Sequence, residues 1–171
     1  MEAYLHYDGK KTRVVELSIS PVAQFPKIVQ IMSAIEIPGF AGADLVRYAV
    51  LELVSNSIRA HREKKTDHKV RVVFSISGTK LNVQVEDRGG GFNPEVLPYD
   101  FSENPEQVDL NSESFQNYRL KNRNERFGMG LLSVRRTFSR FHLSFVTDKG
   151  MQSSWSPEVL GTCIDGEIKL C

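Results

Sequence analysis

The pattern that most constrains the fold is a pair of alternating segments, 70–77 and 80–87, with a turn at Gly78 between them. Apolar side chains occupy every second position in both segments: Val70, Val72, Phe74 and Ile76 in the first, and Leu81, Val83 and Val85 in the second. A period of two is typical of a β-strand that buries one face. The pair therefore predicts a β-hairpin with one apolar face, in a sheet that carries helices on that face only.

Helical spacing of apolar residues marks three further segments, 20–37, 42–65 and 128–141. Alternation and turn residues mark other strands at 3–7, 12–20, 142–148 and 161–170, the first two joined by Asp8-Gly9. These elements predict an α/β (α+β) two-layer sandwich. Its sheet is expected to be mixed but mostly antiparallel, with three main helices on one face. We expect a single domain over residues 1–171.

Charge and cysteine content exclude several classes of function. The chain has 22 basic and 21 acidic residues, so we expect no direct binding to nucleic acid or to an anionic membrane surface. The sequence shows no signal-peptide pattern and no apolar run of membrane-spanning length. Cys163 and Cys171 lack metal-ligand spacing and are too few for a disulfide framework. These features favour a cytoplasmic location.

Residues 93–127 are polar, contain prolines and show no sustained periodicity. A connection of this length inside a compact domain is uncommon and tends to be a functional lid or a disordered segment. Its few apolar residues offer little buried area to offset the entropy of ordering. We therefore expect a lid that is loose without a ligand and becomes ordered when the ligand binds.

Three turns that contain glycine stand at element boundaries. They are Gly89–Gly91 after the strand that ends near Asp87, Gly128-Met129-Gly130 at the start of a helix, and Gly161-Thr162 before the last strand. A glycine at a helix start allows phosphate oxygens to approach free backbone N–H groups, and the helix dipole favours their charge. Taken alone, each could be a structural turn that contacts no ligand. None matches the dinucleotide or P-loop patterns, so neither of those folds is supported.

The second helical segment carries Glu52 and Asn56 four residues apart, hence on one face, with Arg59 near the same stripe. An amide oxygen is a suitable ligand for Mg²⁺, which keeps most of its waters and also binds phosphates. A neighbouring carboxylate can accept the proton of an attacking hydroxyl or water. Taken alone, the pair could equally be two solvated surface residues.

Together, these patterns resemble the GHKL ATP-binding superfamily. The resemblance rests on Glu52-x-x-x-Asn56, Asp87-x-Gly89-x-Gly91, Gly128-x-Gly130 and Gly161-Thr162, in that order, and covers roughly residues 12–170. The superfamily includes gyrase, Hsp90, MutL and the catalytic domains of histidine kinases. Within it, the chain most resembles the anti-sigma-factor serine/threonine kinases. These bind ATP, hold a sigma factor and phosphorylate a small antagonist protein on serine or threonine.

The resemblance implies a role for each residue around the adenine base. Asp87 would accept a hydrogen bond from the adenine amino group, which requires a buried carboxylate. Gly89 and Gly91 would let the backbone pass beside the base and sugar. Thr162 would lie beside the adenine and assist Asp87 through a water molecule.

The resemblance also implies how the phosphates are held. Gly128, Met129 and Gly130 would leave the N-terminus of the third helix free for them. Asn56 would ligate the Mg²⁺ ion that accompanies ATP, and Glu52 would be the general base. Arg126 could reach the γ-phosphate from the lid, although a solvated basic loop explains it equally well.

Some positions depart from the pattern or stand outside it. Ser57 follows Asn56 where these kinases more often have alanine. The segment between the first and second glycine turns, residues 93–127, is longer than usual in these kinases, which leaves the geometry of the lid open. His61, near the end of the second helix, is expected on the surface, as are Arg135 and Arg136 of the third helix.

Two classes of function therefore remain open. The first is an ATP- and Mg²⁺-dependent serine/threonine kinase of the anti-sigma-factor type. The second is a nucleotide-gated binding module that sequesters a regulatory partner without phosphate transfer. In either case the expected partners are a sigma factor, an anti-sigma antagonist protein or both, and the chain could form a homodimer.

Overall fold

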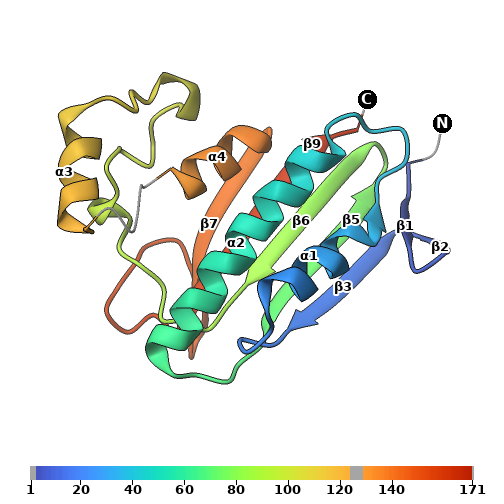
Figure 1. Cartoon of the computed structure of the whole chain (residues 1–171), viewed down its shortest axis with the longest axis horizontal. Helices are drawn as coiled ribbons and strands as arrows, with labels where there is room; N and C mark the ends of the chain where they lie inside the picture. The colour runs from blue at the N-terminus through green and yellow to red at the C-terminus, as the bar shows by residue number, and fades with distance from the viewer. Residues whose placement is uncertain (1–2, 124–128, 171) are drawn as a thin grey trace.

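Six strands form one antiparallel sheet in the order β3-β5-β6-β9-β7-β8, and helices α1, α2 and α4 cover one of its faces (Figure 1). The computed structural model describes residues 3–123 and 129–170. The strands of this sheet are β3 (Val14–Ile19), β5 (Val70–Ser77), β6 (Lys80–Glu86), β7 (Arg140–Thr147), β8 (Gly150–Gln152) and β9 (Gly161–Lys169). The helices are α1 (Phe25–Ser33), α2 (Ala43–Lys64), α3 (Glu113–Lys121) and α4 (Gly130–Thr137).

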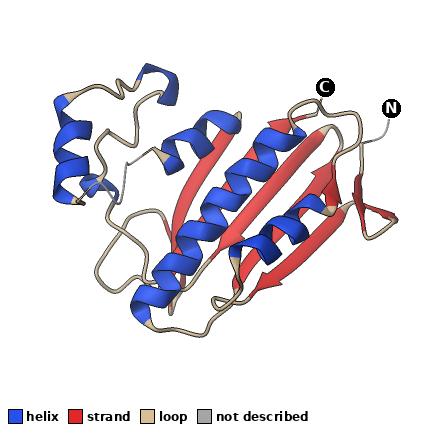
Figure 2. Cartoon of the chain, viewed as in Figure 1, coloured by secondary structure: helices blue, strands red, loops and turns tan. Residues whose placement is uncertain are grey.

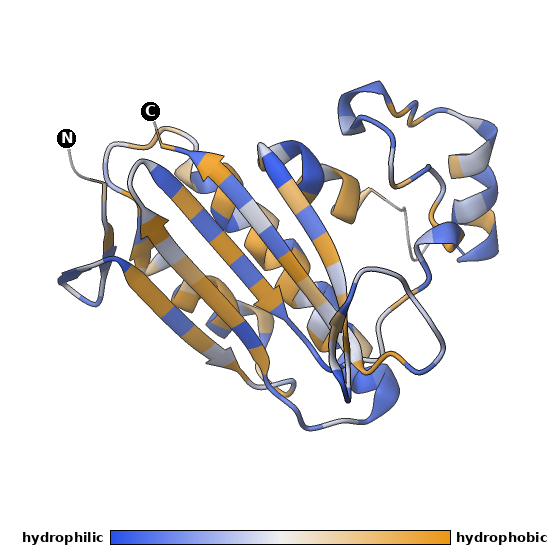
Figure 3. Ribbon diagram, turned by 180° about the vertical axis from the view of Figure 1, so that it is seen from behind, coloured by the Kyte–Doolittle hydropathy of each residue, from blue (hydrophilic) through white to orange (hydrophobic). Residues whose placement is uncertain are grey.

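The two layers confirm the expected fold class. Figure 2 shows the helices in front of the strands, and the view from behind in Figure 3 shows the opposite sheet face without a covering helix. Every strand pair in the described part of the chain is antiparallel. Among the described residues, no helix has both the length and the apolar character needed to cross a membrane.

The predicted β5–β6 hairpin is confirmed, and it lies inside the sheet between β3 and β9. Val72 pairs with Val85 and Phe74 with Val83, and all four side chains are buried beneath the helices. Gly78, in the turn between the strands, has a positive φ of 59°. Each fully buried side chain of this size contributes about 1.5–3 kcal/mol to folding, so the apolar face of the hairpin determines which side the helices cover.

Helix α2 lies along the sheet and buries the expected stripe of Val46, Val50, Leu53 and Ser57. It ends at Lys64 and is followed by Lys65, whose φ of 54° is left-handed, and the Thr66 N–H donates to the His61 carbonyl. Basic side chains in the last turn interact favourably with the negative end of the helix dipole. This helix also carries five of the polar residues that form the candidate site.

Near the N-terminus, the expected hairpin is correct at its turn and wrong in its second strand. β1 (Leu5–Tyr7) pairs across Asp8-Gly9 with β2 (Lys10–Thr12), and β1 also pairs with β4 (Ile35–Glu36) in a small separate sheet. Strand β3 leaves this hairpin and pairs with β5. The reason is burial: β3 exposes and buries alternate residues and contributes three of them to the main core, whereas β2 is polar.

Residues 93–123 contain more local structure than their composition suggested. They include short 3-10 turns at Pro94–Val96 and Pro105–Gln107 and the helix α3, which the sequence did not predict. Tyr99, Val108 and Phe115 form a second small core with Leu132 of α4, and the Tyr99 and Phe115 rings stack at 5.9 Å. Pattern analysis missed this core because its members are irregularly spaced along the chain.

Candidate functional site

A buried carboxylate directly follows strand β6. Asp87 is only 6% exposed, and its Oδ2 accepts hydrogen bonds from the hydroxyls of Ser57 (3.1 Å) and Thr162. Its Oδ1 accepts from the backbone N–H of Gly89 at 2.7 Å. The contact with Thr162 is direct, so the expected water between them is not needed. Buried charged groups are stable when hydrogen-bonded in this way.

The turn after Asp87 is packed closely against neighbouring elements. A Cβ at Gly89 would lie 2.5 Å from the Cβ of Ala60 on α2. Gly91 has a φ of 65°, and a Cβ there would lie 2.7 Å from a methyl group of Val159. Glycine is therefore required at both positions by the fold itself. Room for a base and sugar, the expected reason for these glycines, stays a prediction.

Glu52, Asn56 and Arg59 form a chain of hydrogen bonds along a partly exposed edge of α2. Asn56 Nδ2 donates to Glu52 Oε1 at 3.1 Å, and Arg59 Nη2 donates to Asn56 Oδ1 at 2.5 Å. The spacing expected from the sequence therefore does bring these side chains together. Ser57, which binds Asp87, adjoins Asn56 on the same helix, so α2 links the buried carboxylate to this polar edge.

The start of α4 lies directly against Glu52. Met129 is the residue before the helix, and a Cβ on Gly130 would overlap the Glu52 carboxylate. Glycine at this position allows the two helices to approach. A hollow of about 310 Å³ lies between α2 and α4, bordered by Leu45, Tyr48 and Arg136 with Glu52 in its lining. Arg126 and Gly128, the other residues predicted for this region, lie outside the described residues.

Two arginines of α4 contact residues 93–123, part of the segment predicted to form a lid. Arg135 Nη2 donates to the Glu103 carbonyl at 2.8 Å, and its guanidinium lies 4.5 Å from the centre of the Phe101 ring. Arg136 Nε donates to the Pro105 carbonyl at 2.9 Å. These side chains were expected only to cover the helix surface. Together with the second core, they attach the lid to the helix whose start faces Glu52.

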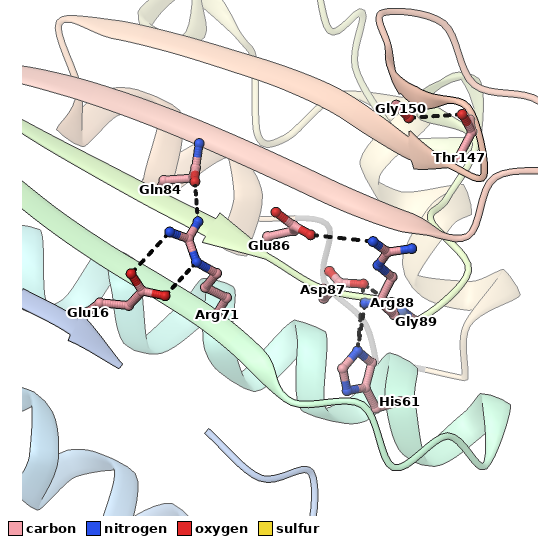
Figure 4. A network of polar contacts seen from close by, with 10 residues as sticks. All are labelled: Glu16, His61, Arg71, Gln84, Glu86, Asp87, Arg88, Gly89, Thr147 and Gly150. Carbon is pink, nitrogen blue, oxygen red and sulfur yellow. Dashed lines mark hydrogen bonds and ion pairs between the residues drawn. The ribbon is translucent and has the colours of Figure 1, made fainter. Parts of the chain in front are cut away.

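Two polar residues that support Asp87 were missed or misplaced by sequence reasoning. The Ser57 hydroxyl was treated only as a replacement for alanine, although it binds the carboxylate. His61 was expected on the surface, but it is fully buried and its Nε2 accepts the backbone N–H of Arg88 at 2.9 Å (Figure 4). The apolar stripe of α2 contained the signal, because His61 follows Ser57 by four residues on the buried face.

The helix-free face of the sheet carries charged and polar side chains. Arg71 binds Glu16 through two hydrogen bonds and Gln84 through a third (Figure 4), and the hydrogen bond from Arg71 holds the pKa of Glu16 below its usual value. A shallow hollow of about 690 Å³ lies on this face, beside Gln84 and His142. It is separated by the sheet from Asp87, Glu52 and Asn56, so it is not part of the candidate site.

The residues present are compatible with a magnesium ion held mainly by a nucleotide. The described residues contain no group of three or more His, Cys, Asp or Glu side chains arranged to hold a metal. Mg²⁺ bound with phosphates needs only one or two protein oxygens, since water and phosphate supply the rest. The Asn56 Oδ1 atom can serve if it exchanges its hydrogen bond from Arg59 for the metal.

Comparison with known proteins adds one finding. A family model described as a histidine kinase-like ATPase domain matches residues 21–152. The matched range holds the polar edge of α2, the turn after Asp87 and the start of α4, whereas Thr162 follows it. No curated protein matches the chain.

Proposed function

Because this chain belongs to the histidine kinase-like ATPase domain family, we propose that it binds ATP with Mg²⁺ and phosphorylates a small protein on serine or threonine, as anti-sigma-factor kinases do. The observation that carries the proposal is the buried Asp87, held by Ser57 on the helix that also presents Glu52 and Asn56. Asp87 would recognise the base, and Asn56 and Glu52, on the same helix as Ser57, would hold the metal and accept the proton.

Asp87 suits recognition of adenine because one of its carboxylate oxygens still has a free acceptor position. Oδ2 accepts from both Ser57 and Thr162, while Oδ1 accepts from Gly89 alone among the described residues. A carboxylate oxygen has two acceptor positions, so Oδ1 has one left for an exocyclic amino group. Adenine presents such a donor. Guanine presents a carbonyl at the same place, which the carboxylate repels.

Asn56 and Glu52 would act at the phosphate end. Asn56 Oδ1 would hold the Mg²⁺ ion, which neutralises phosphate charge when it is bound. Glu52 would accept the proton of the acceptor hydroxyl while that oxygen bonds to the γ-phosphorus. The bond from the γ-phosphorus to the bridging oxygen would break, and ADP would leave. The hollow between α2 and α4 reaches Glu52, which supports approach of an acceptor side chain from that side.

The proposed partners are a cytoplasmic sigma factor and its antagonist, and the chain could act as a homodimer. A direct test incubates the protein with Mg²⁺ and ATP labelled in the γ-phosphate together with a lysate of its own cells. The proposal expects the label on serine or threonine of a small protein, and no label when Mg²⁺ is chelated. Label appearing only as free phosphate would contradict a protein kinase and indicate an ATPase.

A nucleotide-gated binding module is the second candidate. The attachment of the lid to α4 favours it, since a ligand at the start of α4 could then reposition a whole surface formed by residues 93–123. This candidate expects a partner to bind more tightly with ATP than without it, and no phosphate to move to that partner.

A further inference from the structure

We infer that His61 is a positioning residue for adenine recognition, acting through the backbone of Arg88 to aim the Asp87 carboxylate. The inference rests on the proposed binding of an adenine nucleotide and assigns a role to a residue outside the predicted motifs. His61 would touch neither the nucleotide nor the reacting atoms.

The geometry around the imidazole is specific. His61 is fully buried in the last turn of α2, and its Nε2 accepts the Arg88 N–H at 2.9 Å. The neutral ring must then carry its proton on Nδ1. The same Nε2 lies 4.0 Å from Asp87 Oδ1, so the ring is close to the carboxylate (Figure 4).

The other ring nitrogen indicates that packing alone does not explain this histidine. His61 Nδ1 is buried and has no hydrogen-bond partner among the described residues. An unpaired buried donor costs folding free energy, which a leucine of similar volume would avoid. The hydrogen bond to Arg88 is therefore the feature that an apolar side chain could not supply.

Ser57 and His61 fix the position of Asp87 in two ways, through its carboxylate and through the backbone that follows it. They lie four residues apart on α2, where Ser57 binds the carboxylate and His61 binds the amide of the next residue. The Gly89 N–H, one residue further, donates to Oδ1. If the Arg88 bond is lost, the peptide before Arg88 can rotate and Gly89 moves with it. Oδ1 would then no longer present its remaining lone pair in a fixed direction.

The test compares two replacements of the ring by calorimetry with Mg²⁺-ADP and Mg²⁺-GDP. His61→Leu removes the acceptor, and we expect the affinity for ADP to fall about tenfold, the loss of roughly one hydrogen bond. The affinity for GDP should stay unchanged, so the preference for ADP falls by the same factor. His61→Gln places an amide oxygen near the position of Nε2 and should restore ADP binding to within about threefold.

Two further variants control for folding. His61→Asn has an amide too short to reach Arg88 and should behave like His61→Leu, which keeps the test valid if the leucine variant does not fold. His68→Leu changes an exposed histidine and should bind as the wild type does. All variants should share the wild-type near-ultraviolet circular dichroism spectrum.

Three outcomes would overturn the inference while leaving nucleotide binding intact. They are wild-type affinity for ADP in His61→Leu, equal loss in His61→Gln and His61→Leu, and equal loss of ADP and GDP in His61→Leu. A wild-type protein that binds no adenine nucleotide would instead overturn the proposed function, and this inference with it.

Discussion

Asp87 is the residue on which the proposed recognition of a nucleotide depends most, because it is the buried carboxylate that three neighbouring groups hold in place. Asp87→Asn keeps its size but replaces one acceptor oxygen with a donor amide, which would face the adenine amino group. Loss of one charge-assisted hydrogen bond should cost roughly 1.5–3 kcal/mol, about ten- to hundredfold in ADP affinity measured by calorimetry. The exposed Asp67→Asn is the matched control. ADP binding equal to wild type in Asp87→Asn would remove Asp87 from the adenine site.

Cys163 follows Thr162 in β9 and lies on the opposite face of the sheet, so it reports on the opening of that strand. Burial raises the pKa of its thiol to about 12, and the nearby Asp165 and Glu86 carboxylates add to the effect. The neutral thiol is a poor nucleophile. In a Cys171→Ser background, we expect a thiol reagent to modify the native protein at pH 7.5 at least about a hundredfold more slowly than the protein in denaturant. Equal rates would show that β9 opens freely.

Residues 93–123, which we propose as the lid, are held by the second core. Phe115 is fully buried and stacks on Tyr99, and Phe→Ala substitutions in cores cost about 3–5 kcal/mol. Phe115→Ala should therefore accelerate proteolytic cleavage within residues 93–123 severalfold, while the main core, which does not include Phe115, keeps its cooperative unfolding. Leu120→Ala, at a position 71% exposed, should change neither property.

A second lid experiment concerns the ligand. If the lid orders on ATP, Mg²⁺-ATP should protect wild-type residues 93–123 from the same protease, because ordering lowers the population of the open state. Protection should be weaker with ADP than with ATP if the γ-phosphate contributes. Identical cleavage with and without nucleotide would indicate a permanently packed insertion.

The fold of the whole molecule could be predicted where burial follows a simple period. The alternation in β5 and β6 and the stripe from Val46 to Ser57 on α2 each bury one face in register, so sequence spacing translates directly into structure. The small core of Tyr99, Val108, Phe115 and Leu132 has no such period, because its residues meet only after the chain has turned several times.

The candidate site, like the fold, could be predicted where its residues share one element, and not where they come from several. Glu52 and Asn56 lie on one helix and their contact follows from helical geometry. The contacts of Asp87 with Ser57, Thr162 and the turn beside His61 join three elements distant in sequence, and no local spacing encodes them. For His61, the helical spacing predicts a place on the buried face of α2. The same spacing does not predict its hydrogen bond to Arg88.

The Glu52→Gln variant distinguishes a molecule that transfers phosphate, as we propose, from one that only binds nucleotide. Glutamine preserves shape but cannot accept a proton. General-base removal costs about 10²–10⁴ in rate and affects the transition state more than ground-state binding. Asn56→Ala is the contrast, since loss of the metal ligand should weaken Mg²⁺-ATP binding and transfer together.

The decisive measurement is the rate of label transfer from ATP to the acceptor protein, made alongside the ATP affinity of the same Glu52→Gln sample. We expect the rate of transfer to fall by at least about a hundredfold while the ATP affinity changes less than about threefold. Transfer by Glu52→Gln at the wild-type rate would contradict the proposed role of Glu52. Absence of transfer by the wild type, with partner binding unaltered by Glu52→Gln, would contradict the kinase itself and favour the nucleotide-gated binding module.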